Sequence, residues 1–459
     1  MTELSFSNLP LSPGQLANLE SLDYREMTPI QAAALPPALA GTDLIGQAKT
    51  GSGKTVVFGL SLLSRLNPRD FGTQALVLCP TRELASQVAT EIRRLARHQK
   101  NIKVVTLCGG QSIGPQIGSL EHGAHVVVGT PGRIKDHLRK ETLSLERVST
   151  LVLDEADRML DMGFIDDIDT IVATTSKDRQ TMFFSATFPD NIQALSSRFQ
   201  RSPQRVSIAG QEANENITQR FYVCRQGAQL EGLEKLLFHY QPASAVVFCN
   251  TKKRVREVCD QLQQAGIQAR ALHGDMEQRD RDQVLILFKH QSCTVLVATD
   301  VAARGLDIDD LPAVVNVELP RDPEVYVHRI GRTGRAGKDG IALSLVPDSE
   351  MYRLKAIGDY QRKEIEFEPI EFLPNTGKPL PPPPFATLLI QAGRKDKVRA
   401  GDILGALTGD SGIAGKSVGK ISITEYASYV GIARKEAQKA LQGLQNGKIK
   451  GRKFKVREL

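Results

Sequence analysis

The sequence of 459 residues is notable first for what it lacks. It holds no apolar run that approaches the ~20 residues of a membrane-spanning helix. Its first residues carry no basic stretch followed by an apolar core, so we expect no secretory signal. The 6 cysteines are scattered and form no Cys-X-X-Cys pair, which indicates buried thiols in a reducing compartment. These absences predict a cytoplasmic protein without a membrane partner.

A net positive charge is also missing from most of the chain. Residues 385–459 hold 15 Lys and Arg against 6 Asp and Glu, a net charge of +9, while the other 384 residues hold 44 against 46, a net charge of −2. A compact basic segment on a neutral body is typical of nucleic-acid binding. The alternative is a solvated lysine-rich tail, although the segment is patterned like a folded unit.

Apolar runs alternate with helical patterns in two successive parts of the chain. Such near-continuous runs are typical of strands buried on both faces of a parallel sheet. They lie at 75–79, 103–107, 125–128 and 181–184, and then at 245–249, 294–298, 313–317 and 342–345. The predicted fold class is therefore α/β, with two tandem doubly wound domains that bind ligands beyond the carboxyl ends of their strands.

A proline-rich linker at 369–384 precedes the basic segment. The segment itself shows the order strand, helix, strand, strand, helix, strand, which suits a small ferredoxin-like sheet. We expect these elements at 387–390, 401–407, 420–423, 428–432, 435–444 and 454–457. The predicted domains are 1–209, 217–368 and 385–459.

Residues 48–55, Ala-Lys-Thr-Gly-Ser-Gly-Lys-Thr, predict a loop that binds phosphates. Gly51 and Gly53 let the backbone turn its N–H groups towards phosphate oxygens, Lys54 supplies charge at the β- and γ-phosphates, and Thr55 offers a hydroxyl to Mg²⁺. The first position holds alanine where the general pattern has glycine, and a plain glycine-rich turn is the alternative. The expected contacts are Ala48, Lys49, Thr50, Gly51, Ser52, Gly53, Lys54 and Thr55.

Three carboxylates follow another apolar run, at Asp154, Glu155 and Asp157. They would repel one another and resist desolvation unless a cation lay between them. We expect Asp154 to hold Mg²⁺ through its water shell and Glu155 to orient or deprotonate an attacking water. A solvated acidic turn is the alternative. With the loop, this pattern predicts binding and hydrolysis of a nucleoside triphosphate.

Together these motifs resemble the motif set of DEAD-box RNA helicases. The loop at 48–55, Asp-Glu-Ala-Asp at 154–157, Ser-Ala-Thr at 185–187 and His-Arg-Ile-Gly-Arg-Thr-Gly-Arg at 328–335 follow the order of that family. The resemblance implies two RecA-like domains, ATP and Mg²⁺ as cofactors, and RNA as the partner.

The resemblance also implies roles around the nucleoside. Gln31 matches the glutamine that pairs with adenine, and Tyr24 matches the aromatic residue that stacks on it. Asp23 stands where the family usually has glycine, a departure that we expect to be harmless. Asp307 matches the residue that holds the ribose.

The segment 328–335 could be a plain surface loop. In a chain with a phosphate loop elsewhere, we interpret it as a source of arginine fingers, each worth about 10³–10⁵ in rate. The resemblance assigns Arg332 and Arg335 to the γ-phosphate. It also implies that three residues couple hydrolysis to strain in the RNA, namely Ser185, Thr187 and His328.

The resemblance implies RNA contacts on both helicase domains. Hydroxyls, glycine N–H groups and single arginines suit the sugar-phosphate backbone, which carries no sequence information. ATP would close the two domains, and closure would bend one RNA strand. The implied contacts are Thr81, Arg82, Gly110, Thr130 and Arg133 on the first domain, and Gln278, Arg281 and Thr299 on the second.

The basic segment resembles the C-terminal domain of the bacterial DbpA type of this family. The resemblance is carried by Leu-Gly-Ala-Leu-Thr-Gly-Asp at 404–410, Val-Gly-Lys-Ile at 418–421 and Gly-Lys-Ile-Lys-Gly at 447–451. It implies an RRM-like domain that binds a hairpin of 23S ribosomal RNA and a role in assembly of the large ribosomal subunit.

An ordinary RRM stacks bases on two or three aromatic residues of its sheet. The matching positions here hold Leu389, Ala427 and Tyr429, of which Tyr429 alone could stack. We therefore expect basic loops to carry the RNA binding. The expected residues are Arg394, Lys395, Lys397 and Arg399, with Lys448, Lys450, Arg452 and Lys453.

The predicted function is thus an RNA-stimulated ATPase that separates short duplexes locally. Three alternatives stay open: a DNA remodeller, an ATP-dependent RNA clamp that stays closed, and a binding protein with a vestigial helicase core. Intact Lys54, Glu155, Arg332 and Arg335 favour turnover over the last two.

Overall fold

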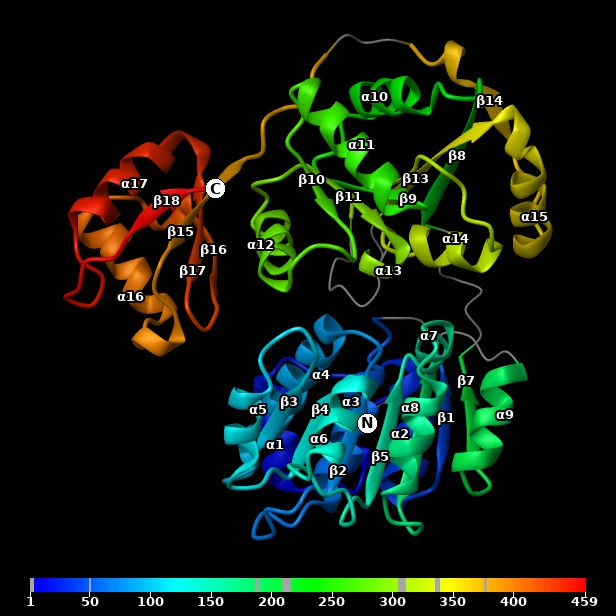
Figure 1. Cartoon of the computed structure of the whole chain (residues 1–459), viewed down its shortest axis with the longest axis vertical. Coiled ribbons are helices and arrows are strands. Elements are labelled where there is room, and N and C mark those ends of the chain that lie inside the picture. Colours follow the sequence, from blue (N-terminus) through cyan, green and yellow to red (C-terminus); the bar gives the residue numbers. More distant parts are fainter. Residues whose placement is uncertain are drawn as a thin grey trace. The chain divides into compact units, whose positions relative to one another are not determined.

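The computed structural model describes residues 4–48, 51–185, 190–208, 216–303, 311–334, 339–374 and 378–459. The chain divides into two compact units, one formed by residues 1–211 with 305–307 and the other by residues 212–304 with 308–459 (Figure 1). In the part of the chain that is described, no helix is both long enough and apolar enough to cross a membrane.

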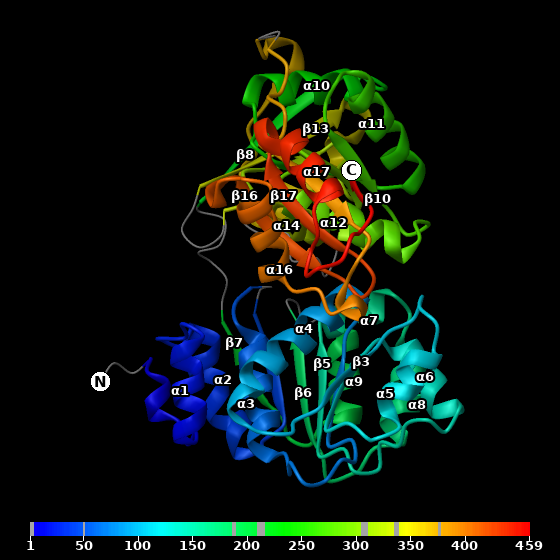
Figure 2. The ribbon, with the colours of Figure 1, turned by 90° about the vertical axis from the view of Figure 1, so that its left-hand side faces the viewer.

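The first unit is built on a parallel sheet of seven strands, ordered β3-β4-β2-β5-β6-β1-β7. Figure 2 shows its strands between α1 to α3 on one side and α5, α6 and α8 on the other. The strands are β1 Leu44–Gln47, β2 Ala75–Leu78, β3 Val104–Leu107, β4 Val126–Gly129, β5 Thr150–Asp154, β6 Gln180–Ser185 and β7 Gln204–Ser207. The helices are α1 Pro13–Ser21, α2 Pro29–Ala40, α3 Lys54–Arg65, α4 Arg82–Leu95, α5 Gly114–Leu120, α6 Pro131–Arg139, α7 Ala156–Asp161, α8 Ile165–Ala173 and α9 Asp190–Phe199.

Both faces of this sheet are apolar, which explains the near-continuous apolar runs in the sequence. Along β5, Val152 packs into the core below α2 to α4, while Leu151 and Leu153 pack into the core below α6 to α8. Helix α4 begins at Arg82 because the hydroxyl of Thr81 accepts the N–H of Leu84 and caps its first turn. The sheet is therefore doubly wound, as the sequence predicts.

The second unit contains a similar parallel sheet, ordered β10-β11-β9-β12-β13-β8-β14. These two sheets confirm the predicted tandem RecA-like arrangement. The strands are β8 Ile217–Cys224, β9 Ala245–Cys249, β10 Ala269–Leu272, β11 Val295–Thr299, β12 Ala313–Asn316, β13 Gly340–Pro347 and β14 Phe367–Pro369. The helices are α10 Gln229–Tyr240, α11 Lys252–Gln264, α12 Gln278–Lys289, α13 Asp300–Ala303, α14 Pro323–Ile330 and α15 Met351–Gln361.

The C-terminal part of the second unit forms an antiparallel sheet ordered β16-β17-β15-β18 (Figure 1). Alternate residues such as Leu388 and Val430 pack against the helices. The strands are β15 Phe385–Ile390, β16 Val418–Ile423, β17 Ser428–Ala433 and β18 Val456–Glu458, and the helices are α16 Ala400–Gly405, continued by a π-helical turn to Asp410, and α17 Ala437–Asn446. The predicted strand and helix order is confirmed.

Candidate nucleotide and RNA sites

The predicted phosphate loop lies between β1 and α3, at the carboxyl edge of the first sheet. Gly51 and Gly53 have φ of 81° and 93°, in the left-handed region that favours glycine. A Cβ on Gly53 would overlap the side-chain amide of Gln31. Lys54 is buried and donates from Nζ to the carbonyl oxygen of Ala48 at 2.5 Å, so its side chain reaches back across the loop.

Five of the predicted site residues lie outside the described part of the chain. They are Lys49 and Thr50 of the loop, Thr187 of the coupling motif, Asp307 for the ribose and Arg335 of the arginine pair.

The predicted acids lie at the carboxyl end of β5, and all three are buried, at 4% exposure for Asp154, 5% for Glu155 and 8% for Asp157. Burial raises the pKa of Asp154 to about 7, against the opposing attraction of Lys54. Burial also lowers the pKa of Lys54, which the three carboxylates oppose. The site thus concentrates negative charge that a further cation would offset.

The donor set fits Mg²⁺ and does not form a complete metal cage. Within the described ranges, no group of three or more His, Cys, Asp or Glu side chains is arranged to hold a metal ion. Mg²⁺ usually keeps several waters and takes one or two carboxylates together with substrate phosphates. One carboxylate at Asp154 and one hydroxyl at Thr55, beside a phosphate loop, are in keeping with that preference.

Glu155 has φ 56° and ψ 51°, a left-handed conformation that costs a non-glycine residue about 1–2 kcal/mol. Its carboxylate accepts a hydrogen bond from Arg158 Nη1 at 2.7 Å, and each of these two side chains is only 6% exposed. Sequence reasoning missed Arg158. The spacing of three residues in a helical turn is the signal that could have found it.

Gln31 is 2% exposed and joins the start of α2 to the phosphate loop. Its Oε1 accepts the N–H of Thr28 at 2.9 Å, and its Nε2 donates to the carbonyl of Gly53 at 3.2 Å. The hydroxyl of Thr28 also donates to the carbonyl of Ser52 at 2.8 Å. The residue implied to recognise adenine therefore also supports the turn implied to bind phosphates.

Tyr24 is half-buried, and its hydroxyl donates to Glu91 Oε1 at 2.7 Å. Asp23, which stands where the family usually has glycine, has φ 65°. The position therefore needs the left-handed conformation, which aspartate tolerates better than most residues. This accounts for the departure from the family pattern.

The RNA residues predicted on the first unit gather where β2, β3 and β4 end side by side. The guanidinium of Arg82 lies against Gly110, which has φ 67° and where a Cβ would overlap Arg82. Arg133 donates from Nη2 to the carbonyl of Gln111 at 2.9 Å. Thr81 caps α4, and Thr130 directly precedes α6. These five residues form one edge of the unit.

The residues predicted on the second unit lie at two places. Gln278 and Arg281 are in the first turns of α12, where Gln278 Nε2 donates to Asp282 Oδ1 at 2.8 Å. Thr299 ends β11, is 8% exposed and accepts the N–H of Ala302 at 3.4 Å.

The structure describes part of the Ser-Ala-Thr motif at 185–187 and part of the arginine segment at 328–335. Ser185 ends β6, is 1% exposed, and its carbonyl accepts the N–H of Ala48 at 3.1 Å, which ties it to the phosphate loop. His328 lies in the last turn of α14. Arg332 is 6% exposed, and its carbonyl accepts the N–H of Leu311 at 3.1 Å.

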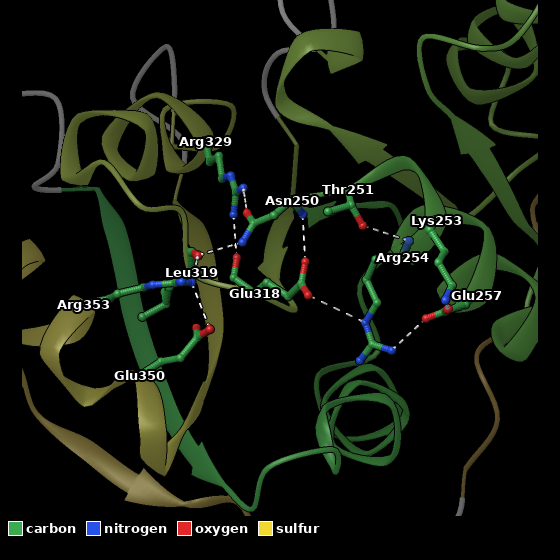
Figure 3. A network of polar contacts seen from close by, with 10 residues as sticks. All are labelled: Asn250, Thr251, Lys253, Arg254, Glu257, Glu318, Leu319, Arg329, Glu350 and Arg353. Atoms are coloured by element: carbon green, nitrogen blue, oxygen red, sulfur yellow. Dashed lines mark hydrogen bonds and ion pairs between the residues drawn. The ribbon is translucent and has the colours of Figure 1, made fainter.

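Arg329 lies at one end of the polar network in Figure 3, where it contacts Asn250 and Glu318, and sequence reasoning gave it no role of its own. It is 2% exposed and its five N–H donors are all used. Nε and Nη2 donate to the two oxygens of Asp300, at 2.6 and 2.8 Å. The other donors reach Asn250 Oδ1 at 2.7 Å, the carbonyl of Glu318 at 2.7 Å and Asn316 Oδ1 at 3.2 Å. One guanidinium thus joins α14 to the ends of β9, β11 and β12.

The basic loops predicted to bind RNA are exposed, and two of them meet. Lys450 donates from Nζ to the carbonyl of Lys397 at 2.9 Å and lies 4.0 Å from Asp402. The two clusters, far apart in sequence, therefore form one surface, which we call the basic surface. Its eight exposed residues are Arg394, Lys395, Lys397, Arg399, Lys448, Lys450, Arg452 and Lys453.

Tyr429 is not available for stacking in this structure, since it is 4% exposed. The face of the sheet that carries it lies against the end of α12 and the residues that follow. His290 Nε2 and the Ser422 hydroxyl lie 2.8 Å apart, and the hydroxyls of Ser292 and Thr387 lie 2.6 Å apart. The expectation that Tyr429 could stack on a base is therefore wrong for this arrangement.

Comparison with known proteins agrees with the geometry of both units. Residues 28–195 match the DEAD/DEAH box helicase family, residues 228–337 the helicase conserved C-terminal domain, and residues 387–458 the DbpA RNA binding domain.

One relative covers the whole chain, and two further proteins cover about four fifths of it. The chain is 52% identical over 459 residues to the ATP-dependent RNA helicase DbpA of Escherichia coli, with all of both chains covered. It is 46% identical over 363 residues to the helicase CshA of Bacillus cereus, which covers 79% of this chain and 69% of that protein. Dbp5 of S. cerevisiae bound to RNA and ADP BeF3 superposes with a TM-score of 0.71 at 32% identity, over 80% of this chain and 96% of that one. The chain therefore belongs to the DEAD-box family of ATP-dependent RNA helicases, in the group that carries a DbpA RNA-binding domain.

Proposed function

We propose that this helicase separates short RNA duplexes locally, and that residues 385–459 direct it to a hairpin of 23S ribosomal RNA. Its place would be the assembly of the large ribosomal subunit in the cytoplasm. The full-length likeness to DbpA and the exposed basic surface support this proposal. We assign the domains to 1–209, 217–368 and 385–459, with a linker at 369–384.

The nucleotide would be bound by both units. Residues 48–55 of the first unit would bind the phosphates, with Gln31 and Tyr24 at the adenine. Arg332 and Arg335 of the second unit would approach the γ-phosphate, with Asp307 at the ribose. Lys54 is buried among three carboxylates, which supports binding of the phosphates at the first unit. The related Dbp5 of S. cerevisiae was solved with both RNA and ADP BeF3 bound, which also favours it.

Thr55 and Asp154 would hold Mg²⁺, which when bound neutralises charge on the phosphates. Glu155 would orient or deprotonate the attacking water. Ser185, Thr187 and His328 would couple hydrolysis to the bending of one RNA strand by RNA-contact residues of both units. Those contacts are the ones predicted from the sequence, at Thr81, Arg82, Gly110, Thr130, Arg133, Gln278, Arg281 and Thr299.

Two substitutions test the assignment of the hydrolysis site. We expect Glu155→Gln to keep ATP and RNA binding and to lose turnover, because the amide cannot accept a proton and holds water differently. Turnover within about tenfold of wild type would reject the role of Glu155. We expect Lys54→Ala to lose nucleotide affinity, and unchanged binding in a titration with a fluorescent ATP analogue would reject the loop assignment.

The RNA target is tested by the ATPase rate of the full chain with three matched nucleic acids. These are a 23S ribosomal RNA fragment, a generic RNA of the same length and DNA of the fragment's sequence. The proposal expects stimulation at the lowest concentration with the ribosomal fragment and none with DNA. Equal stimulation by both RNAs would reject the ribosomal target and leave the helicase assignment in place.

A further inference from the structure

Arg158 lies within the cluster of charged groups at the hydrolysis site, although the family resemblance gave it no role. It is 5% exposed and is close enough to Lys54 to lower the pKa of that lysine. The same lysine is influenced by Asp154, Glu155 and Asp157. The cluster therefore pairs three carboxylates with two cations, and Arg158 is one of the two.

The contact between Arg158 and Glu155 is one-sided. Arg158 Nη1 binds Glu155 Oε2 at 2.7 Å, and the side chains are 6% exposed each. Within the described ranges, Glu155 Oε1 has no hydrogen-bond partner. A carboxylate offers about four lone-pair sites on its two oxygens, so one oxygen can be held while the other accepts from a water.

The backbone supports this arrangement. Glu155 lies in the left-handed conformation directly after β5, and α7 begins at the next residue. The turn brings Arg158 back beneath Glu155, where the N–H of Arg158 also donates to the carbonyl of Glu155 at 3.0 Å. A strained residue with a fixed side chain at a reaction centre is typical of a group whose direction matters.

We infer that Arg158 is a positioning residue for ATP hydrolysis, which holds Glu155 Oε2 so that Oε1 faces the attacking water. The inference rests on the proposed role of Glu155. Arg158 itself would contact neither the attacking water nor the nucleotide. A purely structural ion pair is the rival explanation, since removing one partner of a buried pair also weakens folding.

The test measures single-turnover ATP hydrolysis at saturating RNA for Arg158→Gln and Arg158→Lys, each made in the wild type and in Glu155→Gln. Loss of position alone can cost about 10²-fold, so we expect Arg158→Gln to lower the rate about 10- to 100-fold while the ATP and RNA affinities change less than about twofold. Arg158→Lys should recover part of the rate, because it keeps a donor without the rigid fork. In the Glu155→Gln background the same changes should alter the residual rate less than about twofold.

The matched control is Arg198→Gln, which breaks the exposed 2.8 Å pair of Arg198 with Asp169 in the same unit and should leave the rate unchanged. Equal losses from Arg158→Gln in both backgrounds, or affinities that fall in step with the rate, would overturn the inference. If Arg158→Gln fails to fold, two other variants still decide between these outcomes. They are Arg158→Lys and the double variant Glu155→Gln/Arg158→Gln, which removes both charges. A normal Arg158→Gln rate beside an inactive Glu155→Gln would overturn this inference alone. An active Glu155→Gln would overturn the proposed function of Glu155 and the inference with it.

Discussion

Gln31 Nε2 donates a hydrogen bond to the carbonyl of Gly53 at 3.2 Å, which links the residue implied to recognise adenine to the turn implied to bind phosphates. Gly53 cannot be enlarged without displacing that amide, and its φ of 93° disfavours any other residue. The implied recognition of the base and the shape of the phosphate loop are therefore physically connected.

This link predicts that Gly53→Ala weakens ATP binding strongly, by at least about tenfold, because both the backbone and Gln31 must move. Titration with a fluorescent ATP analogue measures the loss. The control is Gly118→Ala on α5, where a Cβ would meet nothing within 4 Å and helix propensity favours alanine. Similar affinities for the two variants would contradict the connection.

The basic surface predicts a salt-dependent loss of RNA affinity. The triple variant Lys448→Gln/Arg452→Gln/Lys453→Gln should lower affinity for the RNA hairpin and flatten its salt dependence by about 0.7–0.9 for each phosphate contact removed. The control triple changes Lys416, Lys435 and Lys439 to Gln, which are also exposed and remove the same charge. If both triples flatten the slope equally, general attraction and not this surface binds the RNA.

His290 predicts a pH dependence for the contact between α12 and the C-terminal sheet. Burial lowers the pKa of His290 to about 4, assisted by nearby Lys420, whereas a solvated imidazole titrates near pH 6.5. The separated state therefore binds more protons between these values. The contact keeps its full stability above about pH 6.5 and weakens as the pH falls towards 4, by up to about 3 kcal/mol.

Fluorine NMR of fluorotyrosine-labelled protein can follow this change, because Tyr429 is buried in the contact and Tyr429→Phe assigns its signal. The signal should shift towards that of exposed tyrosine on acidification, and His290→Gln should remove the pH dependence. Replacement of exposed His122 should leave it unchanged. A Tyr429 signal in the wild type that does not change with pH would contradict the prediction.

Arg329 predicts a large effect on the stability of the second unit. Arg329→Met leaves Asp300, Asn250 and Asn316 without their common donor, so the free energy of unfolding of the second unit should fall by about 3 kcal/mol or more. Arg256→Gln, which breaks a pair with Asp275 at 54% side-chain exposure, should cost less than about 1 kcal/mol. Urea unfolding of the two variants provides the comparison, and equal midpoints would show that the network adds no stability.

Most of the fold follows from local patterns. The apolar runs predict the buried strands because both faces of each sheet are covered, and the first residue of α4 follows from the cap at Thr81. Strands with polar or mixed patterns were not predicted. In β7 only Val206 is buried, and β8 mixes buried, partly buried and exposed residues, so neither forms a continuous apolar run.

The remaining features depend on contacts between distant segments. The partners of Arg329 come from three strand ends, and Lys450 meets Lys397 across 53 residues, so neither contact leaves a local pattern. Tyr429 is a further case in which a contact with a distant segment decides whether a residue is exposed. Its strand pattern cannot reveal that another part of the unit covers that face.

We propose that one ATP is bound from both units, and the distance between them under ligand control tests this proposal most directly. Energy transfer between a dye on exposed Lys100 and a dye on exposed Lys253 should report a shorter distance when an ATP mimic and single-stranded RNA are both present. We expect Arg332→Gln to reduce this change while leaving ATP binding to the first unit intact. A full change in Arg332→Gln, or none in the wild type with both ligands bound, would contradict it.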